Sequence, residues 1–321
     1  MSVSICTIGE LLVEFLAKEP NQGFMAPGEF LGPFPSGAPA IYADQVAKLG
    51  FQSALFSCVG KDDFGRMCLD RLSDDGVNID GISVLPKTTT GSAFVSYRNQ
   101  HQRDFIFNMT NGACGYLSTE HLDEIQLSRC DHFHIMGSSL FSFRIIDAMR
   151  KAINIVKLHG GTVSFDPNIR KEMLNIPEMT QAFEYILEYT DFFLPSEGEV
   201  AHFAKGKNKS ESAIVDDLLA SGVKHVIIKR GPQGASYYHQ DSSSQKTGSL
   251  HAPGFPVRVV DPTGAGDCFG ATFISLFLAG YPVEKALTYA NASGSLAISK
   301  RGPMEGASTL AEIEAFLQQY C

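Results

Sequence analysis

Apolar runs of strand length alternate along most of this chain with segments in which apolar residues recur every three or four positions. The strand-like runs span 4–15, 53–60, 132–139, 161–167, 191–196 and 225–231. The helix-like segments span 38–50, 62–76, 143–160, 178–189 and 212–222. Apolar strands separated by helices are typical of a parallel sheet that helices cover on both faces. The pattern therefore predicts the α/β class, with a mostly parallel central sheet.

Two segments interrupt this alternation. Residues 13–35 are punctuated by glycine and proline, and residues 84–110 hold two β-rich runs around a polar turn at 99–102, which is typical of a hairpin. Both segments are too short to fold alone, so we expect them to pair into a small β-sheet lid. The rest of the chain would form the main α/β domain, which binds nucleotide and substrate: 1–12, 36–83 and 111–321.

Composition narrows the class of partner. The chain has 321 residues, 44% of them hydrophobic, which is ordinary for a globular protein. Its formal net charge is -9 and its basic residues do not cluster, so we expect no binding to nucleic acid or to a membrane surface. The seven cysteines are scattered without a C-x-x-C pair, which indicates reduced thiols in the cytoplasm rather than disulfides or a zinc site.

The stretch "DPTGAGDCFG", residues 261–270, runs directly into the apolar segment "ATFISLFLAG". Gly264 and Gly266 would let the backbone approach a phosphoryl group, and the first amides of the following helix would face that group. Asp267 at this junction has two interpretations: it caps the helix, or it is a general base that accepts a proton from an alcohol. No Walker pattern and no H-R-D motif accompany the turn.

The stretch resembles the C-terminal signature of the ribokinase-like (PfkB) carbohydrate kinases. Further stretches match that family in order and spacing: "GELLVEF", "SGAPAIYADQVAKLG", "CVGKDDFGRMCLDRLSDDGV", "FDPNIR", "LPSEGEV", "VIIKRGPQGA" and "YANASGSLAISKRG". Among its members the chain is most similar to tagatose kinases, with 2-keto-3-deoxygluconate kinases and fructokinases as near relatives. The resemblance implies ATP-dependent phosphorylation of a sugar hydroxyl, with a ketohexose such as tagatose or fructose as substrate. The alternatives are 2-keto-3-deoxygluconate kinase, and a sugar-binding regulator without turnover.

The resemblance also implies roles for individual residues. Asp267 would be the base, and Gly264, Ala265 and Gly266 would form the anion hole. Glu199 would organise Mg²⁺ and its waters, although Ser196 replaces the asparagine usual in that motif; a solvated acidic helix start is the other interpretation of Glu199. The residues implied in nucleotide binding are Ser196, Lys229, Gly231, Gly234, Gly264, Gly266 and Asn291. In some members, positions matching Asp261 and Thr263 hold a monovalent cation such as K⁺; a simple turn at Asp261–Pro262 is the alternative.

On the sugar side, the residues implied in substrate binding are Glu14, Gly37, Tyr97, Arg103, Asn168, Arg170 and Asp267. Glu14 stands where aspartate is usual, Ser36 replaces a glycine, and Ile41 replaces an asparagine that touches substrate. Arg103 and Arg170 match arginines that bind the carboxylate of keto-acid sugars, and Arg103 as a solvated turn residue stays open. The period-two aromatic pattern around Tyr97 also fits simple packing. His132 and His134 on one strand are expected to be structural, and an exposed edge of the lid predicts a homodimer.

Overall fold

The computed structural model describes residues 3–98, 103–169, 177–204, 206, 209–240 and 247–320. The larger of its two sheets has nine strands. The strand order is β13-β12-β11-β10-β9-β8-β1-β4-β5. All neighbours pair in parallel except at the edge, where β12 is antiparallel to both β11 and β13. The strands are β1 (Ser4–Ile8), β4 (Gln52–Gly60), β5 (Ile82–Leu85), β8 (His132–Met136), β9 (Thr162–Asp166), β10 (Phe192–Phe193), β11 (His225–Lys229), β12 (Ala235–Gln240) and β13 (Thr247–Ala252).

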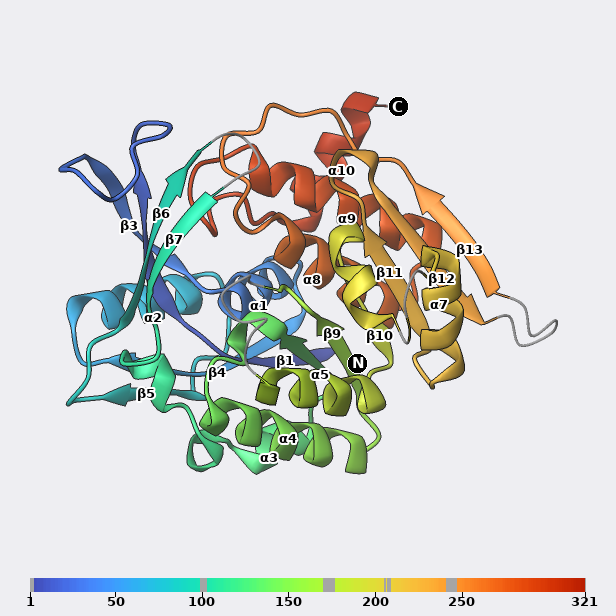
Figure 1. The fold of residues 1–321 in the computed structure, drawn as a ribbon, viewed down its shortest axis with the longest axis horizontal. Coiled ribbons are helices and arrows are strands. Elements are labelled where there is room, and N and C mark those ends of the chain that lie inside the picture. The colour runs from blue at the N-terminus through green and yellow to red at the C-terminus, as the bar shows by residue number, and fades with distance from the viewer. Residues whose placement is uncertain are drawn as a thin grey trace.

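Helices cover both faces of this sheet (Figure 1). One face carries α1 (Ala38–Lys48), α8 (Ala265–Leu278) and α9 (Val283–Ile298), with α10 (Leu310–Leu317) packed against α9. The other face carries α3 (Glu124–Ser128), α4 (Phe143–Leu158), α5 (Pro177–Tyr189) and α7 (Glu211–Ala220). The prediction of an α/β fold with a mostly parallel, doubly covered sheet is therefore confirmed.

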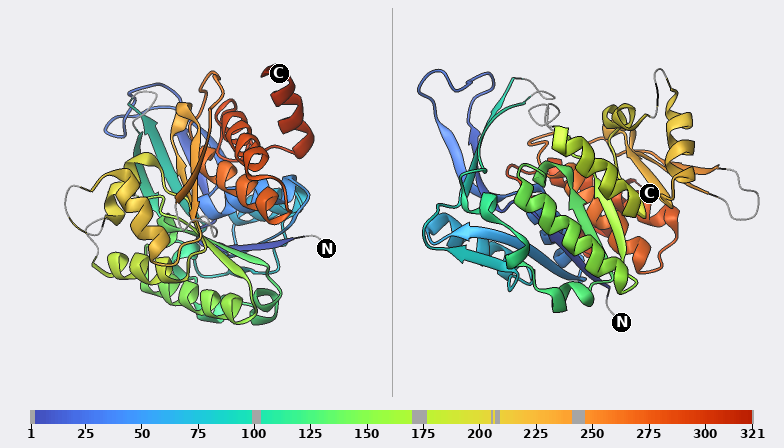
Figure 2. Two further views of the ribbon diagram at one scale, coloured as in Figure 1. Left: turned by 90° about the vertical axis from the view of Figure 1, so that its right-hand side faces the viewer. Right: turned by 60° about the horizontal axis from the view of Figure 1, so that its bottom comes forward.

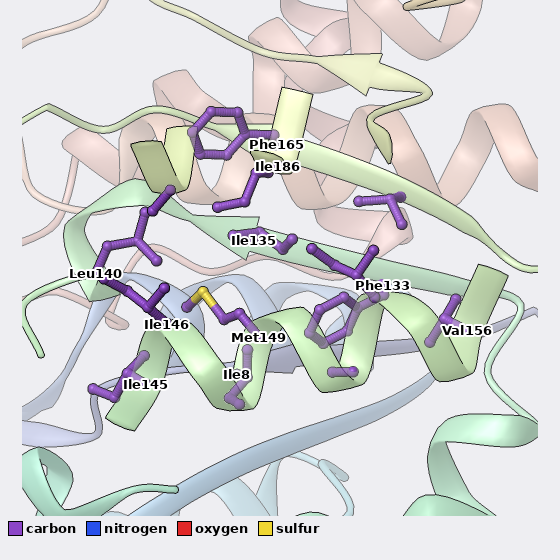
Figure 3. Close-up of a cluster of buried hydrophobic side chains, with 14 of the residues drawn as sticks. Ile8, Phe133, Ile135, Leu140, Ile145, Ile146, Met149, Val156, Phe165 and Ile186 are labelled. Atoms are coloured by element: carbon purple, nitrogen blue, oxygen red, sulfur yellow. The ribbon is translucent and has the colours of Figure 1, made fainter. Parts of the chain in front are cut away.

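The side chains of β8 alternate between the two faces, as the pleat of a strand requires. Phe133 and Ile135 lie in one buried core with Met149 and Val156 of α4, and each of these four side chains is 1% exposed or less (Figure 3). His132 and His134 point to the opposite face, where Ser164 of β9 contacts both imidazoles at 2.6 Å. Burial lowers the pKa of His132 to about 3, so its imidazole is neutral. These contacts give the two histidines a structural role.

A second sheet projects from the first (Figure 2), and its four strands are ordered β3-β2-β6-β7. They are β2 (Leu12–Ala17), β3 (Phe30–Ser36), β6 (Gly91–Tyr97) and β7 (Arg103–Asn108). The two central strands, β2 and β6, pair in parallel, and the outer pairs are antiparallel. This is the predicted small sheet, and α2 (Asp63–Asp74) packs against β2 and β3 beside it.

Residues 4–15 form two strands in different sheets, so the prediction of one strand there is wrong. β1 ends at Ile8, and β2 starts at Leu12 in the small sheet. Gly9 lies between them with φ 149°, and a Cβ atom at Gly9 would lie only 2.2 Å from Oγ of Ser139. Only glycine fits this crossing, where the chain changes sheet. The strand β5 pairs with β4, so residues 84 and 85 belong to the large sheet.

Within the described ranges, no helix combines the length and the apolar character that crossing a membrane requires.

Candidate active site

A cavity of about 720 Å³ lies where the large sheet, the start of α8 and the small sheet meet. Asp166 at the end of β9 and Lys229 at the end of β11 line it. Both strands belong to the parallel part of the sheet, so their carboxyl ends share one edge, and ligands of open α/β sheets bind at that edge. Glu14 and Phe105 of the small sheet also line the cavity. The cavity is therefore walled by both sheets.

The glycine turn, residues 261–266, leads into α8 at one end of the cavity. Gly264 is the N-cap of α8 and has φ 83°, a left-handed conformation that favours glycine. A Cβ atom at Gly264 would lie 2.6 Å from the carbonyl oxygen of Pro303 and 3.3 Å from Cγ2 of Ile41, which also lines the cavity. Because the N-cap residue has no side chain, the first amides of α8 lack the usual capping oxygen and can bind an anion.

Asp267 is the third residue of α8, and it lines the cavity with a relative exposure of 9%. The N-cap position belongs to Gly264, three residues earlier. The carboxylate of Asp267 therefore stands about one helical turn from the cap, beside the amides that begin the helix. Proximity of an acid and an anion-binding helix start is the arrangement that the sequence predicted.

Lys229 brings a positive charge to the same place. Its ammonium group forms an ion pair with the buried carboxylate of Asp166, and a Cβ atom at Gly266 would lie 3.4 Å from its Nζ. Burial alone would lower the pKa of Lys229, but the carboxylates of Asp166, Glu199 and Asp267 outweigh it and hold that pKa above its ordinary value. Lys229 is therefore a fixed cation next to the start of α8.

Glu199 lies in the short helix α6 (Glu197–Val200), next to Ser196, and both line the cavity. Its Oε2 accepts hydrogen bonds of 2.7 Å from the backbone amide and from the hydroxyl of Ser196. Its Oε1 accepts one of 2.7 Å from the amide of Ile169, which follows β9. Glu199 thus ties two loops together at the cavity, and the serine that replaces asparagine completes a capping box.

The described residues contain no cluster of three or more histidine, cysteine or acidic side chains that could hold a metal ion. A single cavity-lining carboxylate, Glu199, still suits Mg²⁺, because this ion keeps several waters and binds substrate phosphates with one or two carboxylates.

Glu14 and Ser36, two of the residues named above as departures from the resembled family, contact each other. The side chain of Glu14 is 4% exposed, and Oγ of Ser36 donates a 2.7 Å hydrogen bond to its Oε2. Ser36, which stands in place of a glycine, thus supplies a hydrogen-bond donor to Glu14, which stands in place of the shorter aspartate. Gly37 follows with φ 119°, and a Cβ atom there would lie 2.2 Å from the carbonyl oxygen of Glu10. Glycine at this position lets two segments of backbone approach closely beside the cavity.

Glu10 is a cavity-lining acid that the sequence reasoning missed. Its side chain is 4% exposed, and its two oxygens accept hydrogen bonds from Ser138 at 3.2 Å and from Ser139 at 2.5 Å. Asn168, which the sequence assigned to the sugar, donates from its Nδ2 to Oγ of Ser138 at 3.3 Å. The signal for Glu10 was present, because a carboxylate inside an apolar run needs buried partners.

Other predicted residues lie around the cavity or at its border. Gly231 and Thr263 line it, as does Arg103, whose guanidinium lies 5.3 Å from the ring centre of Phe105. Arg170 lies outside the described residues. Four predicted residues are absent from the described lining of the cavity: Tyr97, Gly234, Asp261 and Asn291. Their assignments to ligands stay predictions.

The contacts of these bordering residues are with the protein. Asn291 donates from Nδ2 to the carbonyl oxygens of Ala252 and Pro253, at 3.0 and 3.1 Å. Asp261 is 1% exposed and accepts from the hydroxyl of Tyr97 at 2.9 Å.

Comparisons with known proteins point to one family. The family model described as "pfkB family carbohydrate kinase" matches residues 3–310. The curated "Probable fructokinase-6, chloroplastic" of Arabidopsis thaliana is 32% identical over 315 residues, which are 95% of this chain and 80% of that protein. A crystal structure of the apo form of "a putative Ribokinase II" from E.coli shares 54% identity over 99% of both chains, with a TM-score of 0.93. Its counterpart in complex with ATP and Mg+2 shares 53% identity, again over 99% of both chains, with a TM-score of 0.92.

Proposed function

Since this chain belongs to the pfkB family of carbohydrate kinases, we propose that it transfers the γ-phosphoryl group of ATP to a hydroxyl of a ketohexose such as tagatose or fructose. That it is an ATP-dependent sugar kinase follows from the family; the sugar and the residue roles are our proposal. The observation that carries the proposal is the position of Asp267 beside the open start of α8 and the ammonium group of Lys229. The curated relative named a fructokinase supports the ketohexose.

In the proposed reaction, the sugar hydroxyl oxygen attacks the γ-phosphorus while the bond to the bridging oxygen of ADP breaks. Asp267 accepts the hydroxyl proton, and the first amides of α8 with Gly264, Ala265 and Gly266 hold the transferring group. Lys229 offsets the negative charge that spreads over the phosphoryl oxygens. The small sheet acts as a lid that excludes water from the cavity. In this proposal Asp267 transfers the proton, the start of α8 positions the phosphoryl group and Lys229 stabilises its charge.

Mg²⁺ enters the proposal through Glu199. The carboxylate would hold the ion through its waters near the phosphates, where the ion supplies charge neutralisation. The solved relative in complex with ATP and Mg+2 supports this choice of ion.

K⁺ does not fit the residues that the family resemblance implies for it. The carboxylate of Asp261 already accepts from Tyr97 at 2.9 Å, from the amide of Thr263 at 3.0 Å and from the amide of Gly302 at 3.1 Å. The hydroxyl of Thr263 accepts from Arg103 at 3.0 Å. The Asp261 carboxylate and the Thr263 hydroxyl already accept from these donors, so they do not suit a monovalent cation, and the proposed reaction involves none.

The substrate is tested with a panel of tagatose, fructose, ribose and 2-keto-3-deoxygluconate, with ADP formation and the phosphorylated sugar measured in potassium and in sodium buffers. We expect kcat/KM for a ketohexose to exceed that for the sugar acid at least tenfold, because the buried carboxylates of Glu10 and Glu14 accept hydroxyl donors and repel an anion. We expect equal rates in the two buffers. Turnover of the sugar acid alone would refute the ketohexose proposal, and a potassium requirement would refute the interpretation of Asp261.

Arg103 favours the second candidate, 2-keto-3-deoxygluconate kinase. It lines the cavity, and a guanidinium can bind a carboxylate in bidentate fashion. In this structure its Nη1 donates to Thr263 instead. A regulator without turnover is a third candidate, and the complete glycine turn with Asp267 argues against it, because a binding protein has no need of a base there. Absence of ADP formation with every sugar in the panel would favour the regulator.

We also propose that two copies pair through their small sheets. Aromatic side chains pack together on the face of this sheet that points away from the cavity. The ring of Phe15 stacks on that of Phe94 with the ring centres 5.1 Å apart, and Phe30 meets Phe94 edge to face with the ring centres 5.8 Å apart. Ile106 on the same face is 46% exposed. Sedimentation equilibrium should give twice the mass of one chain, and Ile106→Glu should shift the protein toward one chain. A single-chain mass for the unaltered protein would rule this pairing out.

A further inference from the structure

Two hydrogen bonds join the small sheet to the glycine turn. The hydroxyl of Tyr97, the last residue of β6, donates to Oδ1 of Asp261 at 2.9 Å. Nη1 of Arg103, the first residue of β7, donates to Oγ1 of Thr263 at 3.0 Å. Tyr97 and Arg103 are paired across the two strands, so both contacts come from one rung of the ladder. We call these two hydrogen bonds the latch.

The latch acts on the backbone of the glycine turn itself. Oδ1 of Asp261, which accepts from Tyr97, also accepts from the amide of Thr263 at 3.0 Å. Its other oxygen accepts from the amide of Gly302 at 3.1 Å. Thr263 immediately precedes Gly264, the N-cap of α8. A shift of the small sheet is therefore transmitted through one buried carboxylate to the residue that begins the anion-binding helix.

The far side of the turn is held by contacts other than the latch. The carbonyl oxygen of Pro303 lies 2.6 Å from the Cβ position of Gly264. The following residues are anchored by Arg71 of α2, which donates to the carbonyl oxygen of Met304 and to Glu305, both at 3.0 Å. Because this wall has anchors of its own, loss of the latch is expected to shift mainly the side of the turn that faces the cavity.

We propose that Tyr97 and Asp261 are positioning residues that align the glycine turn for phosphoryl transfer only when the small sheet is closed over the sugar. The inference rests on the proposed kinase function. Residues that hold reacting groups must be aligned within a fraction of an ångström, so a small shift of the turn lowers the rate strongly. The latch thus couples occupancy of the sugar side to alignment of the phosphate side, and it limits loss of ATP to water when no sugar is bound.

The electrostatics of the latch fit this role. Burial, together with the negative charge of Asp261, raises the pKa of the Tyr97 phenol, so the phenol stays protonated and remains a donor. A hydrogen bond to a buried charged acceptor is stronger than one between neutral groups. Opening of the small sheet breaks this bond, and the carboxylate of Asp261 then lacks one donor until water takes the place of the phenol.

The test is a double-mutant cycle of Tyr97→Phe and Asp261→Asn, with kcat/KM measured for the best sugar of the panel at saturating ATP. Each single variant should lower kcat/KM roughly 10- to 100-fold, in line with loss of a hydrogen bond to a charged group. The double variant should be within about threefold of Asp261→Asn alone, because both changes remove the same contact. The fold-change of Tyr97→Phe should be equal for all sugars, whereas a residue that binds sugar would change their order.

Ser92→Ala is the matched control, because Ser92 lies on β6 with its side chain on the opposite face, where it accepts from Asn108 at 3.4 Å. It should change kcat/KM less than about twofold. If the effects of Tyr97→Phe and Asp261→Asn instead multiply, the latch is refuted. The same cycle can be measured by urea unfolding, which needs no substrate and therefore separates the two proposals. Non-additive changes in the free energy of unfolding, without turnover of any sugar, would support the Tyr97–Asp261 contact and refute the kinase proposal. Additive changes together with sugar turnover would refute the latch and leave the kinase proposal standing.

Discussion

Asp267→Asn is expected to lower kcat by about a thousandfold or more while leaving sugar affinity within about threefold, since a positioned general base contributes roughly a hundred- to ten-thousandfold to a rate. The amide cannot accept the proton of the sugar hydroxyl, but it keeps the size and polarity of the acid beside the start of α8. Calorimetric titration of the sugar and a coupled ADP assay measure the two quantities separately.

Glu284→Gln is the matched control for this variant. It makes the same change from carboxylate to amide in the first turn of α9, the helix that packs against α8, at a side chain that is exposed and absent from the described lining of the cavity. The control should leave kcat unchanged. A kcat of Asp267→Asn within about tenfold of the unaltered protein would overturn the base assignment and favour a structural role for the carboxylate.

Lys229→Met is expected to lower kcat roughly a hundred- to thousandfold, because it removes a preorganised positive charge from the place where the phosphoryl charge develops. The KM for ATP should rise as well. Methionine keeps much of the length of the side chain without its charge. Steady-state kinetics with varied ATP measure both effects.

Lys229→Met also leaves Asp166, which is 1% exposed, without its cation, so a loss of stability must be separated from a loss of catalysis. The double variant Lys229→Met with Asp166→Asn removes the uncompensated charge, and it should recover thermal stability but not kcat. Lys224→Met, at an exposed lysine that precedes the same strand, is the control and should leave kcat unchanged. Recovery of kcat together with stability in the double variant would show that Lys229 has no direct part in the reaction.

The parts of the site that come from adjacent residues were predictable from the sequence. Gly264, Gly266 and Asp267 lie within one turn of chain, and their local geometry depends on glycine and on the helix start that follows. The parallel sheet was predictable for the same reason, because each buried strand and each amphipathic helix has its own local pattern.

The contacts between distant residues could not be predicted in this way. Tyr97 and Asp261 are separated by 164 positions, and no local pattern tells that a phenol of the small sheet meets this carboxylate. The break at Gly9 was hidden because apolar residues stand on both sides of the crossing, so the run looked continuous. Ser36 was predicted as a departure from the family, but its hydrogen bond to Glu14 became visible only in three dimensions.

Two separate segments of the chain form the small sheet: the first contributes β2 and β3, and the second contributes β6 and β7. The parallel pair of β2 and β6 joins these two segments. A hybrid gene that switches parent anywhere between residues 37 and 90 would therefore bring strands of two ancestries together at that central pair. Such hybrids inherit cavity-lining side chains from both parents on adjoining strands. We therefore expect that an exchange of specificity between related kinases requires both stretches to be transferred together.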